Sequence, residues 1–577
     1  MFCKEKLFLQ GVRVAVALVT IMVLANVVQA QTDPGPRPVG NASRSVCPIP
    51  SAKFPGDPPC IDNVQPPDSS GVDGAGNVIA NGGNLAGFWF QALTVFETPA
   101  VVGPEPQTGG SSFPGLGPSF NAVSCFQCHS QPTVGGSSPN ANTPGFPNGN
   151  PQVGDAPTTT QLNNVSSFIS ATGPVREARF PHAVGGSGNR AAVSAGAVAE
   201  LFVIQGRSDA PANCLIDQED FPTQVANNNI IFRIPIPTFG EGFVENTPDD
   251  NLMADLAQEN ATANNTNLFN PPLGITGSFN HSGNDQTITR FGWKAQNKSM
   301  LMFAGEASNV EMGVTNDLFQ NERTVGNNQC APNPEPEDRL VVPPITGDPR
   351  TITDLFNNFG NAGVASDISN NIENFAIFMR LNAAPAVCNF NSGLDSSGAA
   401  QCLALNASSQ RGQALFGSLD PGVAGSFTSS AAPPTLTAGI KSIGCVLCHS
   451  DFLTTTKSQS PSLSDANFHP FSDFAVHTMD SSLADGVTQG QAGGNMFRTA
   501  PLWGIGQRLF FLHDGRASDL LTAIKDHAPN AGTNPANCTA AMGEACQVIV
   551  LFNKLPATSG STGTPSQEDI LHFLRSL

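Results

Sequence analysis

Two short cysteine–histidine motifs are the residues of this 577-residue sequence whose spacing points most clearly to chemistry. "SCFQCHS" begins at Ser124 and "GCVLCHS" begins at Gly444, so Cys-x-x-Cys-His occurs twice and ends at His129 and at His449. On one helical turn, positions i, i+3 and i+4 share one side, so two sulfurs and an imidazole can face a single porphyrin. Each motif therefore predicts a haem c, held by two thioethers, with its histidine bound to the iron.

Two other kinds of site also use a Cys-x-x-Cys pair, namely a thioredoxin-like dithiol and half of a zinc site. Neither of them requires the adjacent histidine, and two copies that are each followed by Ser are improbable by chance. The motifs thus favour two covalently bound haem c groups. The haem-binding residues that we expect are Cys125, Cys128, His129, Cys445, Cys448 and His449.

The N-terminus has the pattern of a secretory signal. Lys4, Lys6 and Arg13 precede an apolar run at residues 14–28, and "VQA" follows, which predicts cleavage after Ala30. An uncleaved anchor is the alternative, but the run is short for a bilayer-spanning helix. We therefore expect a periplasmic or secreted protein with no stable membrane insertion after signal cleavage.

The cysteine count suggests disulfides in addition to the haem attachments. Of 13 cysteines, Cys3 leaves with the signal and four bind haem, so an even number of eight remains. In an oxidising compartment an even remainder predicts disulfide bonds. The candidate pairs are Cys47–Cys60, Cys388–Cys402 and Cys538–Cys546, which leaves Cys214 with Cys330.

The charge balance restricts the partners. The formal net charge is −19, and it becomes −21 when the signal, with three basic groups and one acidic group, is removed. Such an acidic chain is unsuited to nucleic acid or to an anionic membrane, and it suits a small basic redox protein as electron donor. The sequence also has no tyrosine, which excludes a tyrosine iron ligand or radical relay.

The elements that must position the motifs are predicted to be helices within long irregular segments, because Gly, Pro and Asn are abundant. A helix ahead of each motif and further helices behind it is the cytochrome c arrangement. We therefore expect a mainly α fold with extensive irregular loops and two cytochrome c-like haem domains, the first heavily elaborated. The predicted divisions are a signal (1–30), a Pro/Gly/Asn-rich wrap (31–85), a haem domain (86–345) and a second haem domain (346–577).

Three blocks of the sequence resemble a known family. "GLGPSFNAVSCFQCHS", "RFGWKAQNKSMLMFAGEASNVEMGVTN" and "FRTAPLWGIGQRLFFLHDGRASDLLTAIKDH" are similar to the di-haem peroxidase-like oxidoreductases. These are relatives of bacterial di-haem cytochrome c peroxidases and of the di-haem enzyme that matures tryptophan tryptophylquinone. The resemblance extends from about Gly87 to the C-terminus. It implies that one haem relays electrons while the other presents an open iron to peroxide, and it allows for a structural calcium ion.

The resemblance also implies two catalytic residues. Family members have a tryptophan between the haems in "FWDGR" and a glutamate over the peroxide site in "NPVEM"; "RFGWKAQ" and "SNVEMG" place Trp293 and Glu311 at these positions. A carboxylate can move the proton of a bound peroxide from the near oxygen to the leaving oxygen. The sequence differs from the family in "FGWKA", and the nearby Glu306 is an alternative carboxylate.

The first haem has no evident sixth ligand. After His129 the next histidines are His182 and His281, whereas the resembling peroxidases have a displaceable histidine soon after the first motif. Methionines at such spacings are more often core residues than ligands. We therefore expect a five-coordinate or water-bound catalytic iron. The methionines that could bind instead are Met253, Met300, Met302 and Met312.

The second haem is predicted to be closed by a histidine on both sides. In "SDLLTAIKDHA", His527 continues the apolar stripe of a helix at the i, i+4 and i+7 positions. We expect it to be the sixth ligand opposite His449, with His513 of "LHDGR" supporting the site through hydrogen bonds. His477 and Met479 are rival ligands. Two histidine ligands give a lower potential than a histidine and a methionine.

Three functions are compatible with these residues. The first is a peroxidase that reduces hydrogen peroxide with electrons from a small donor, which Glu311 favours. The second is an oxygenase or oxidase that activates dioxygen on an organic substrate, as in the related polyisoprene-cleaving protein, and the missing sixth ligand favours it. The third is a non-enzymatic di-haem electron-transfer cytochrome, which would be favoured if His182 or His281 bound the first haem.

Overall fold

The computed structural model describes only part of the chain. The described residues are 85–101, 113–141, 143, 145–154, 165–186, 188, 192–204, 216–316, 318–319, 368–382, 406–421, 426–427, 442–458, 463–560 and 563–577. The predicted signal (1–30) and, apart from its last residue, the predicted wrap (31–85) lie outside these residues. So does the predicted boundary between residues 345 and 346.

Helices and irregular segments make up most of the described structure. The helices are α2 (Leu85–Glu97), α3 (Cys125–Cys128), α4 (Pro151–Gly154), α5 (Phe221–Ala226), α6 (Glu241–Glu245), α7 (Asp249–Ala263), α8 (Met300–Met312), α10 (Ile368–Leu381), α11 (Asn406–Phe416), α12 (Leu520–Asp526), α13 (Cys546–Lys554) and α14 (Gln567–Arg575). Short 3-10 turns are η5 (Cys445–Leu447), η7 (Ser481–Leu483), η8 (Ile505–Gln507), η9 (Pro535–Asn537) and η10 (Ala540–Met542). None of the described helices combines the length and the apolar character that a membrane span needs.

The strands are short and form several small sheets. They are β1 (Ala100–Val101), β2 (Phe113–Pro114), β3 (Ser119–Phe120), β4 (Glu177–Arg179), β5 (Val198–Ala199), β6 (Phe202–Val203), β7 (Ile231–Arg233), β8 (Asn280–His281), β9 (Ile288–Thr289), β10 (Leu453–Thr454), β11 (Asn467–Phe468), β12 (Val476–Thr478) and β13 (Met496–Arg498). The sheet β5–β4–β7 has three strands, and the pairs β1–β2, β3–β6, β8–β9, β10–β11 and β12–β13 have two. The expected loop-rich helical fold is therefore confirmed in part, since small sheets accompany the helices.

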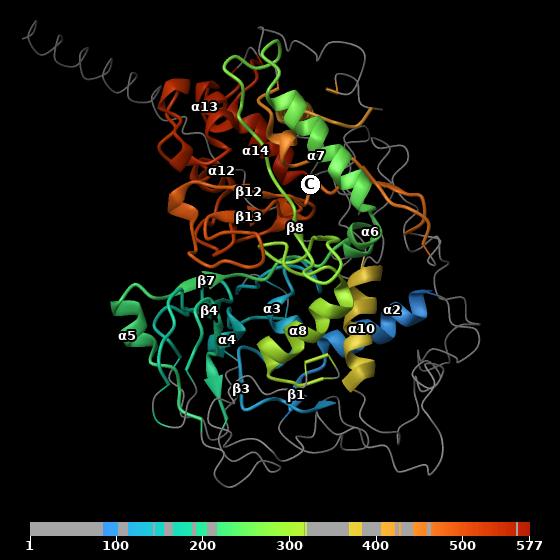
Figure 1. The fold of residues 1–577 in the computed structure, drawn as a ribbon, viewed down its shortest axis with the longest axis vertical. Coiled ribbons are helices and arrows are strands. Elements are labelled where there is room, and N and C mark those ends of the chain that lie inside the picture. The colour runs from blue at the N-terminus through green and yellow to red at the C-terminus, as the bar shows by residue number, and fades with distance from the viewer. Residues whose placement is uncertain are drawn as a thin grey trace, which may run out of the picture.

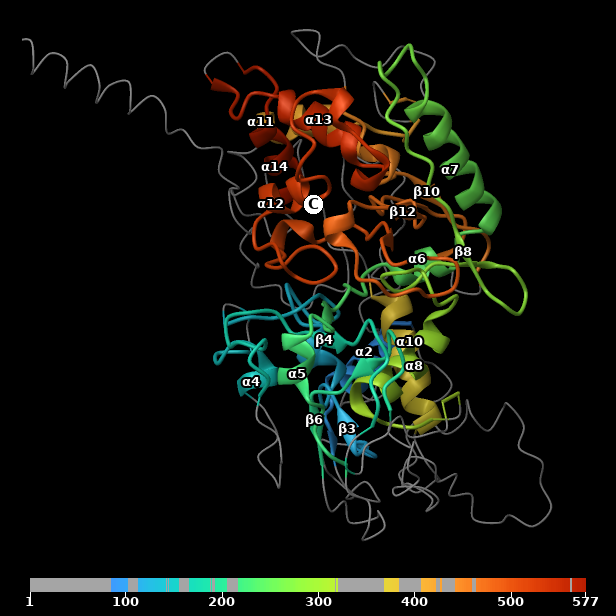
Figure 2. The same ribbon diagram turned by 60° about the vertical axis from the view of Figure 1, so that its left-hand side comes forward.

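One hydrophobic core surrounds the first motif. Helix α10 packs against both α2 and α8, and Figures 1 and 2 show the three helices together in the lower part of the molecule. Phe96 of α2 lies 4.2 Å from Phe378 and 6.4 Å from Phe375 of α10 between ring centroids. Each buried phenylalanine contributes about 1.5–3 kcal/mol relative to an exposed one. Helix α10 follows residue 345 in sequence, yet it completes this first core.

A second core surrounds the second motif. Helix α11 packs along α14, and Phe416 and Phe573 meet with ring centroids 5.2 Å apart. Helix α14 begins with a capping box, in which the Ser566 side chain accepts from the Asp569 backbone N–H and the Asp569 carboxylate accepts from the Ser566 N–H. Helix α7 comes from the first half of the sequence but packs on η5 and β10. Figure 1 shows α7 in the upper part of the molecule, near elements of the second half. Each core is thus completed by chain from the other predicted domain.

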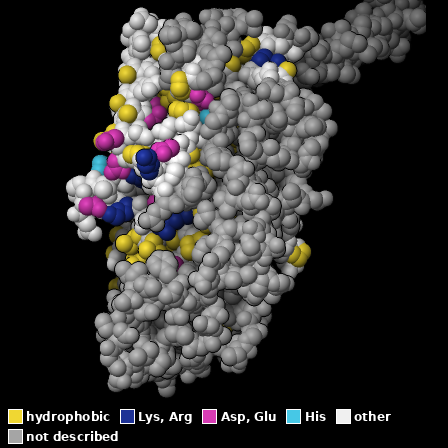
Figure 3. All heavy atoms as spheres, turned by 90° about the vertical axis from the view of Figure 1, so that its right-hand side faces the viewer, with side chains coloured by type: hydrophobic (Ala, Val, Ile, Leu, Met, Phe, Trp, Pro, Cys, Tyr) yellow, Lys and Arg dark blue, Asp and Glu magenta, His cyan; other side chains and the backbone are white. Residues whose placement is uncertain are grey.

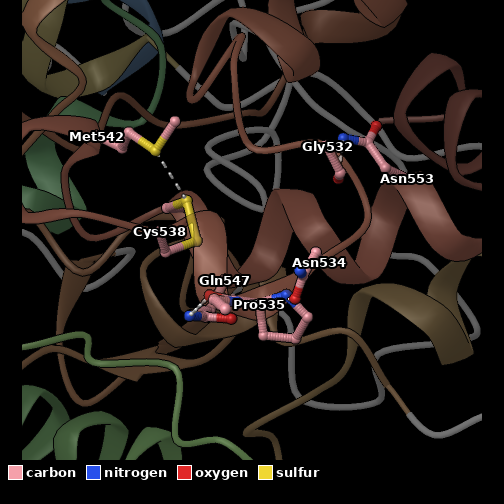
Figure 4. Close-up of a disulfide and its surroundings, with 9 residues drawn as sticks. Gly532, Asn534, Pro535, Cys538, Met542, Gln547 and Asn553 are labelled. Carbon is pink, nitrogen blue, oxygen red and sulfur yellow. Dashed lines mark hydrogen bonds between the residues drawn. A yellow bond between two sulfur atoms is a disulfide. The ribbon is translucent and has the colours of Figure 1, made fainter.

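One disulfide lies in the described residues. Cys538 and Cys546 are bonded, with their Cα atoms 5.7 Å apart, which confirms one of the predicted pairs. Figure 4 shows this bond beside Met542, whose sulfur lies 3.7 Å from that of Cys546. Gln547, next along α13, donates to the Pro535 carbonyl at 3.0 Å. The remaining predicted pairs lie outside the described residues.

Candidate haem sites

The first motif is held in a shape that leaves one imidazole nitrogen available. The Ser124 hydroxyl caps α3, and the backbone N–H of His129 donates to the Cys125 carbonyl at 2.9 Å. The His129 ring places Nδ1 3.0 Å from the Gly136 carbonyl oxygen. Because a carbonyl can only accept, Nδ1 carries the proton and Nε2 presents its lone pair. This is the second partner that iron-binding histidines need for a fixed ring orientation.

The second motif repeats this arrangement. Gly444 precedes η5 at φ +89°, and a Cβ there would come within 2.7 Å of the Leu273 side chain. The His449 backbone N–H donates to Cys445 at 3.0 Å, and its Nδ1 lies 3.0 Å from the Phe471 carbonyl oxygen. Again Nε2 is left with its lone pair. Both histidines are therefore oriented as iron ligands by a backbone carbonyl.

A phenylalanine from the preceding helix backs each of these histidines. The ring of Phe96 at the end of α2 lies 6.2 Å from that of His129, edge on at 64°. The ring of Phe416 at the end of α11 lies 6.3 Å from that of His449, at 49°. The interval from Phe96 to Cys125 has the same length as the interval from Phe416 to Cys445. The two attachment sites thus share both geometry and spacing.

The surroundings of the cysteines argue against the two alternative sites. Burial raises the pKa of Cys125 and of Cys445 to about 12, whereas a redox-active dithiol needs a lowered thiol pKa. None of the four motif cysteines forms a disulfide. Within the described part of the chain, no group of three or more His, Cys, Asp or Glu residues is arranged to bind a metal ion. The structural calcium ion stays a prediction.

A cavity of about 1330 Å³, its open mouth included, lies beside the first motif. The first motif is part of its lining, so a haem attached to this motif would extend into the cavity. The cavity brings together predicted residues that are far apart in sequence. Those that line it are Cys125, Cys128, His129, Trp293, Glu306 and Glu311.

Glu311 stands on the wall that α8 contributes. Ser299 caps the start of this helix, and Gly313 ends it at φ +65°. The Glu311 carboxylate accepts a hydrogen bond of 2.9 Å from the Asn121 side chain, and its backbone carbonyl accepts from the Asn121 N–H at 2.7 Å. Glu306, one and a half turns earlier, accepts from the Asn297 amide. Both carboxyl groups line the cavity, so the structure keeps both as candidates for proton transfer.

Charged residues on the strands β4 and β7 complete this wall, and the sequence analysis missed them. The antiparallel register places Glu177 opposite Arg233, and Arg179 follows on the same face of β4. Burial alone would raise the pKa of Glu177, but Arg179, Arg233 and a hydrogen bond with Glu311 lower it to about 2. The sequence "EAR", in which Glu177 and Arg179 alternate with an apolar residue, could have indicated a charged strand face. The partner on β7 lies too far along the sequence to be read from it.

The other candidate ligands of the first iron are distributed unevenly. Met300 and Met312 are buried and line the cavity, whereas Met253 and Met302 are 48% and 39% exposed. His182 is exposed and His281 is half-buried on β8, and neither lines the cavity. Among the described residues along this cavity, His129 is the single histidine. The arrangement is that of one histidine accompanied by carboxyl groups and arginines.

A second cavity, of about 1450 Å³ with its mouth included, lies beside the second motif. Its lining includes the second motif together with residues of β12, α12 and α13. The predicted residues along it are Cys445, Cys448, His449, His477, Met479, His513 and His527. The expected ligands and their rivals are therefore all gathered in one place.

His527 has the orientation of an iron ligand. Asp519 caps α12 through its side chain, and His527 follows directly after the last helical residue. Its Nδ1 lies 2.8 Å from the Ala523 carbonyl oxygen, so Nε2 keeps its lone pair, as in the two motif histidines. The pKa of His449 is lowered to about 4, first by burial and next by the nearness of His527. The two imidazoles therefore line the same cavity.

His477 has no free ring nitrogen. Its Nε2 lies 2.8 Å from Asp473 and its Nδ1 lies 3.0 Å from Glu544. Burial would lower the pKa of His477, but Cys448 and Asp473 raise it well above its usual value. An imidazole that donates both protons to carboxylates has no lone pair for iron. His477 is thus disfavoured as a ligand by geometry.

His513 and Met479 also line the second cavity. The His513 ring stacks on Phe497 at 4.3 Å and 25°, and burial lowers its pKa to about 4. It also meets the Trp293 ring at 6.3 Å and 74°. The ring contacts that the structure describes for His513 are aromatic, whereas we expected support through hydrogen bonds. Met479 remains a rival to His527.

Trp293 lines both cavities. Its indole N–H donates to the Ile234 carbonyl at 2.9 Å, and its own carbonyl accepts from the Arg498 N–H at 2.9 Å. Arg498 belongs to β13, so a strand of the second half fixes the loop that presents this tryptophan. The indole is therefore placed between the two sites, where a relay would have to be.

The comparison with family models agrees with this geometry. Residues 427–549 match the model described as "Di-haem oxidoreductase, putative peroxidase". This part of the chain is therefore similar to the di-haem oxidoreductases. The match supports the family resemblance and contains the second motif, His527 and the last of the three resembling sequence blocks. No curated protein and no solved structure matched the chain.

A haem in either cavity would bring carboxylate propionates, and two buried arginines are suited to bind them. In the protein alone, Nε and Nη2 of Arg498 and of Arg508 are buried and have no hydrogen-bond partner. Arg498 lines both cavities and Arg508 lines the second. Burial lowers the pKa of Arg508 to about 10. A buried cation needs a counter-charge, and a carboxylate of the cofactor would provide it. The residues present therefore fit a haem in each cavity.

Proposed function

We propose that this chain is an exported di-haem c-type oxidoreductase, periplasmic or secreted, that reduces peroxide at the haem bound by His129. Electrons would reach that site from a second haem bound by His449 and His527. The observation that carries the proposal is the difference between the two cavities. Carboxyl groups and arginines accompany a single described histidine in the first, whereas a second histidine faces His449 in the other.

The haem, when bound, supplies an iron that accepts electrons and binds the small oxidant. Reduction of hydrogen peroxide to two waters consumes two electrons and two protons, so the cavity must also move protons. The carboxyl of Glu311 is suited to take a proton from one peroxide oxygen and return it to the leaving oxygen. Glu177, whose pKa is held at about 2 chiefly by Arg179 and Arg233, adds another carboxyl group to the lining of this cavity.

Electron supply is the second part of the proposal. Trp293, as a wall of both cavities, would shorten the path between the haems. The net charge of −19 favours a small basic redox protein as donor. On the described part of the face in Figure 3, however, acidic and basic side chains lie intermixed. The docking site of the donor is therefore left unassigned.

An oxygenase is the second candidate, because an iron with one protein ligand can also bind dioxygen. Mixing the fully reduced protein with peroxide, and separately with oxygen, in a stopped-flow spectrometer distinguishes the two. We expect peroxide to oxidise both haems rapidly, with two electrons lost per chain. A long-lived oxygen adduct with slow peroxide oxidation would favour the oxygenase instead. Two low-spin irons that react with neither would favour an electron-transfer cytochrome.

A further inference from the structure

Three buried charged residues form a bridge beside the two cavities. The Lys294 ammonium lies 3.0 Å from Oδ1 of Asp485, and Nη2 of Arg233 lies 2.9 Å from Oδ2 of the same carboxylate. Lys294 also donates to the Gly493 carbonyl at 2.8 Å, and Arg233 donates to Gln489 at 2.6 Å. Lys294 is completely buried and Arg233 nearly so. The carboxylate of a loop in the second half thus holds two cations from the first half.

The Lys294 ammonium also caps a set of stacked rings. It lies 3.9 Å from the centroid of Phe497, near enough for a cation–π interaction. Phe497 stacks on His513 at 4.3 Å, and His513 meets Trp293 edge on at 6.3 Å. Trp293 lines both cavities, and Phe497 and His513 line the second. The cation is therefore in contact with the aromatic group that separates the two sites.

The charge of this bridge does not cancel. Burial lowers the pKa of Lys294, which Asp485 partly offsets, to about 8, so the ammonium is charged at neutral pH. Burial alone would raise the pKa of Asp485, but Arg233 and Lys294 lower it. The two cations and one anion of the bridge leave a net positive charge beside the rings, because Glu177, which lies opposite Arg233, is balanced by its own ion pair with Arg179. Such a charge opposes the removal of an electron from a neighbouring group, and low dielectric strengthens the effect.

We propose that Lys294 is a positioning residue for electron transfer, whose buried charge sets the electrostatic potential of the Trp293–His513–Phe497 group between the two haems. The inference rests on the two-haem part of the proposed function and not on peroxide as substrate. In the step concerned, one electron leaves the second haem and arrives at the first, and no bond forms or breaks. The positive charge makes a hole on Trp293 unfavourable, so the electron passes without an oxidised indole accumulating.

The test compares two replacements with a matched control in the haem-loaded protein. Lys294→Met removes the charge, Lys294→Arg keeps it, and Lys298→Met removes an exposed lysine that pairs with Asp285. Midpoint potentials of both haems are measured by equilibrium redox titration in the absence of peroxide. Removing a positive charge that lies about 10 Å from a haem iron would shift the ferric–ferrous equilibrium of that haem roughly tenfold toward the ferric state. For a one-electron couple this is a lowering of about 59 mV.

Lys294→Met is expected to show this lowering at one haem or both, while Lys294→Arg and Lys298→Met keep the potentials of the unaltered protein. Equal potentials in all four proteins would overturn the proposal, as would Lys294→Arg behaving like Lys294→Met, because packing would then be the cause. Should Lys294→Met lose haem or fail to fold, Lys294→Gln removes the charge and keeps a donor for Gly493. The redox titration uses no peroxide. A protein that does not react with peroxide can therefore still show the expected lowering of the midpoint potential, which separates this proposal from the choice of substrate.

A second readout follows the indole itself. One equivalent of peroxide is mixed with the protein whose two haems are both ferric, so that the haems cannot supply both electrons from the ferrous state and one can be drawn from the indole. Freeze-quenched samples of Lys294→Met should then show a narrow organic radical signal by electron paramagnetic resonance. Adding Trp293→Phe should abolish that signal, and Lys294→Arg should not produce it. A radical of equal size in the unaltered protein would contradict the role given to the charge.

Discussion

The two haem cavities are built alike on the side of the attaching histidine and differently on the other side. His129 and His449 are each oriented by a backbone carbonyl and backed by a phenylalanine. Beyond this common part, the first cavity receives Glu311 from α8, and the second receives His527 from the end of α12. The arrangement around the motif histidine is thus repeated in the fold, and under the proposed function the reactivity of each site depends on the other residues that line its cavity.

Glu311→Gln should give the largest effect, because it removes the proton acceptor. It keeps the size of the side chain and an oxygen that can accept the hydrogen bond from Asn121. Peroxide turnover is expected to fall by roughly 10²- to 10⁴-fold with both haems still attached. Steady-state kinetics and a pyridine haem spectrum measure the two quantities. Glu306→Gln is the matched control on the same helix. If only the control lost activity, Glu306 would be the working carboxylate.

His527→Ala should make the second cavity resemble the first. Loss of the sixth ligand is expected to convert the low-spin signal of that haem to high-spin, and carbon monoxide should then bind both ferrous haems. His527→Met should keep the iron six-coordinate and raise its potential, since methionine ligation favours the ferrous state. Optical and magnetic-resonance spectra follow both variants. An unchanged low-spin spectrum in His527→Ala would move the ligand to Met479 or His513.

Phe96→Ala and Phe416→Ala test whether the phenylalanine behind each motif histidine contributes equally to stability in the two halves. Each ring is at most 2% exposed, and truncating a buried phenylalanine costs about 3–5 kcal/mol. The free energy of unfolding, from urea titrations, should fall by similar amounts in both variants. Leu318→Ala, at an exposed position, should change it by less than about 0.5 kcal/mol. A large loss in only one phenylalanine variant would show that the sites are not equivalent.

Two glutamates should give the cavities opposite pH responses of smaller size. Burial would raise the pKa of Glu544, but hydrogen bonding to His477 and its charge lower it from 4.5 to about 2. Its contribution to stability is therefore present above pH 4.5 and is lost as pH falls toward 2. Burial raises the pKa of Glu241, in the first cavity, to about 7. Ionising it costs stability, so stability declines as pH rises from 4.5 through 7.

Melting temperatures at closely spaced pH values measure both effects. Glu544→Gln should remove the acid-side loss, and Glu241→Gln should remove the decline toward neutral pH, each corresponding to on the order of 1–3 kcal/mol. The two variants serve as controls for each other. A common pH profile in both would contradict the assignment of opposite environments.

The features that could be predicted from the sequence are those formed by residues that lie close together along the chain. The Cys538–Cys546 bond, which spans only a few residues of chain, is confirmed. The second motif and His527 are local patterns too, and the structure places them along one cavity. On a helical turn, the spacing of nearby residues decides which side chains point in the same direction. Such features can therefore be predicted without knowing the fold.

Features that join distant segments could not be predicted in this way. Arg233 reaches Glu177 through strand pairing and reaches Asp485 through a contact between the two halves. Lys294 was read only as a departure from the family pattern, because its carboxylate partner lies in a loop far along the chain. The packing of α10 on α2 was likewise hidden, since an amphipathic helix shows that it has a buried face but not which core it joins.

The equal interval between phenylalanine and motif in the two halves has a consequence for how such a chain can grow or be re-engineered. The segment from Phe96 to Cys125 matches that from Phe416 to Cys445 in length, whereas the segment from His129 to α10 is much longer than that from His449 to α14. Extra sequence has thus been accommodated downstream of the attachment point and excluded upstream of it. A grafted loop or reporter should be tolerated beyond Gly136 and Phe471, whose carbonyls orient the two histidines, and rejected before the first cysteine.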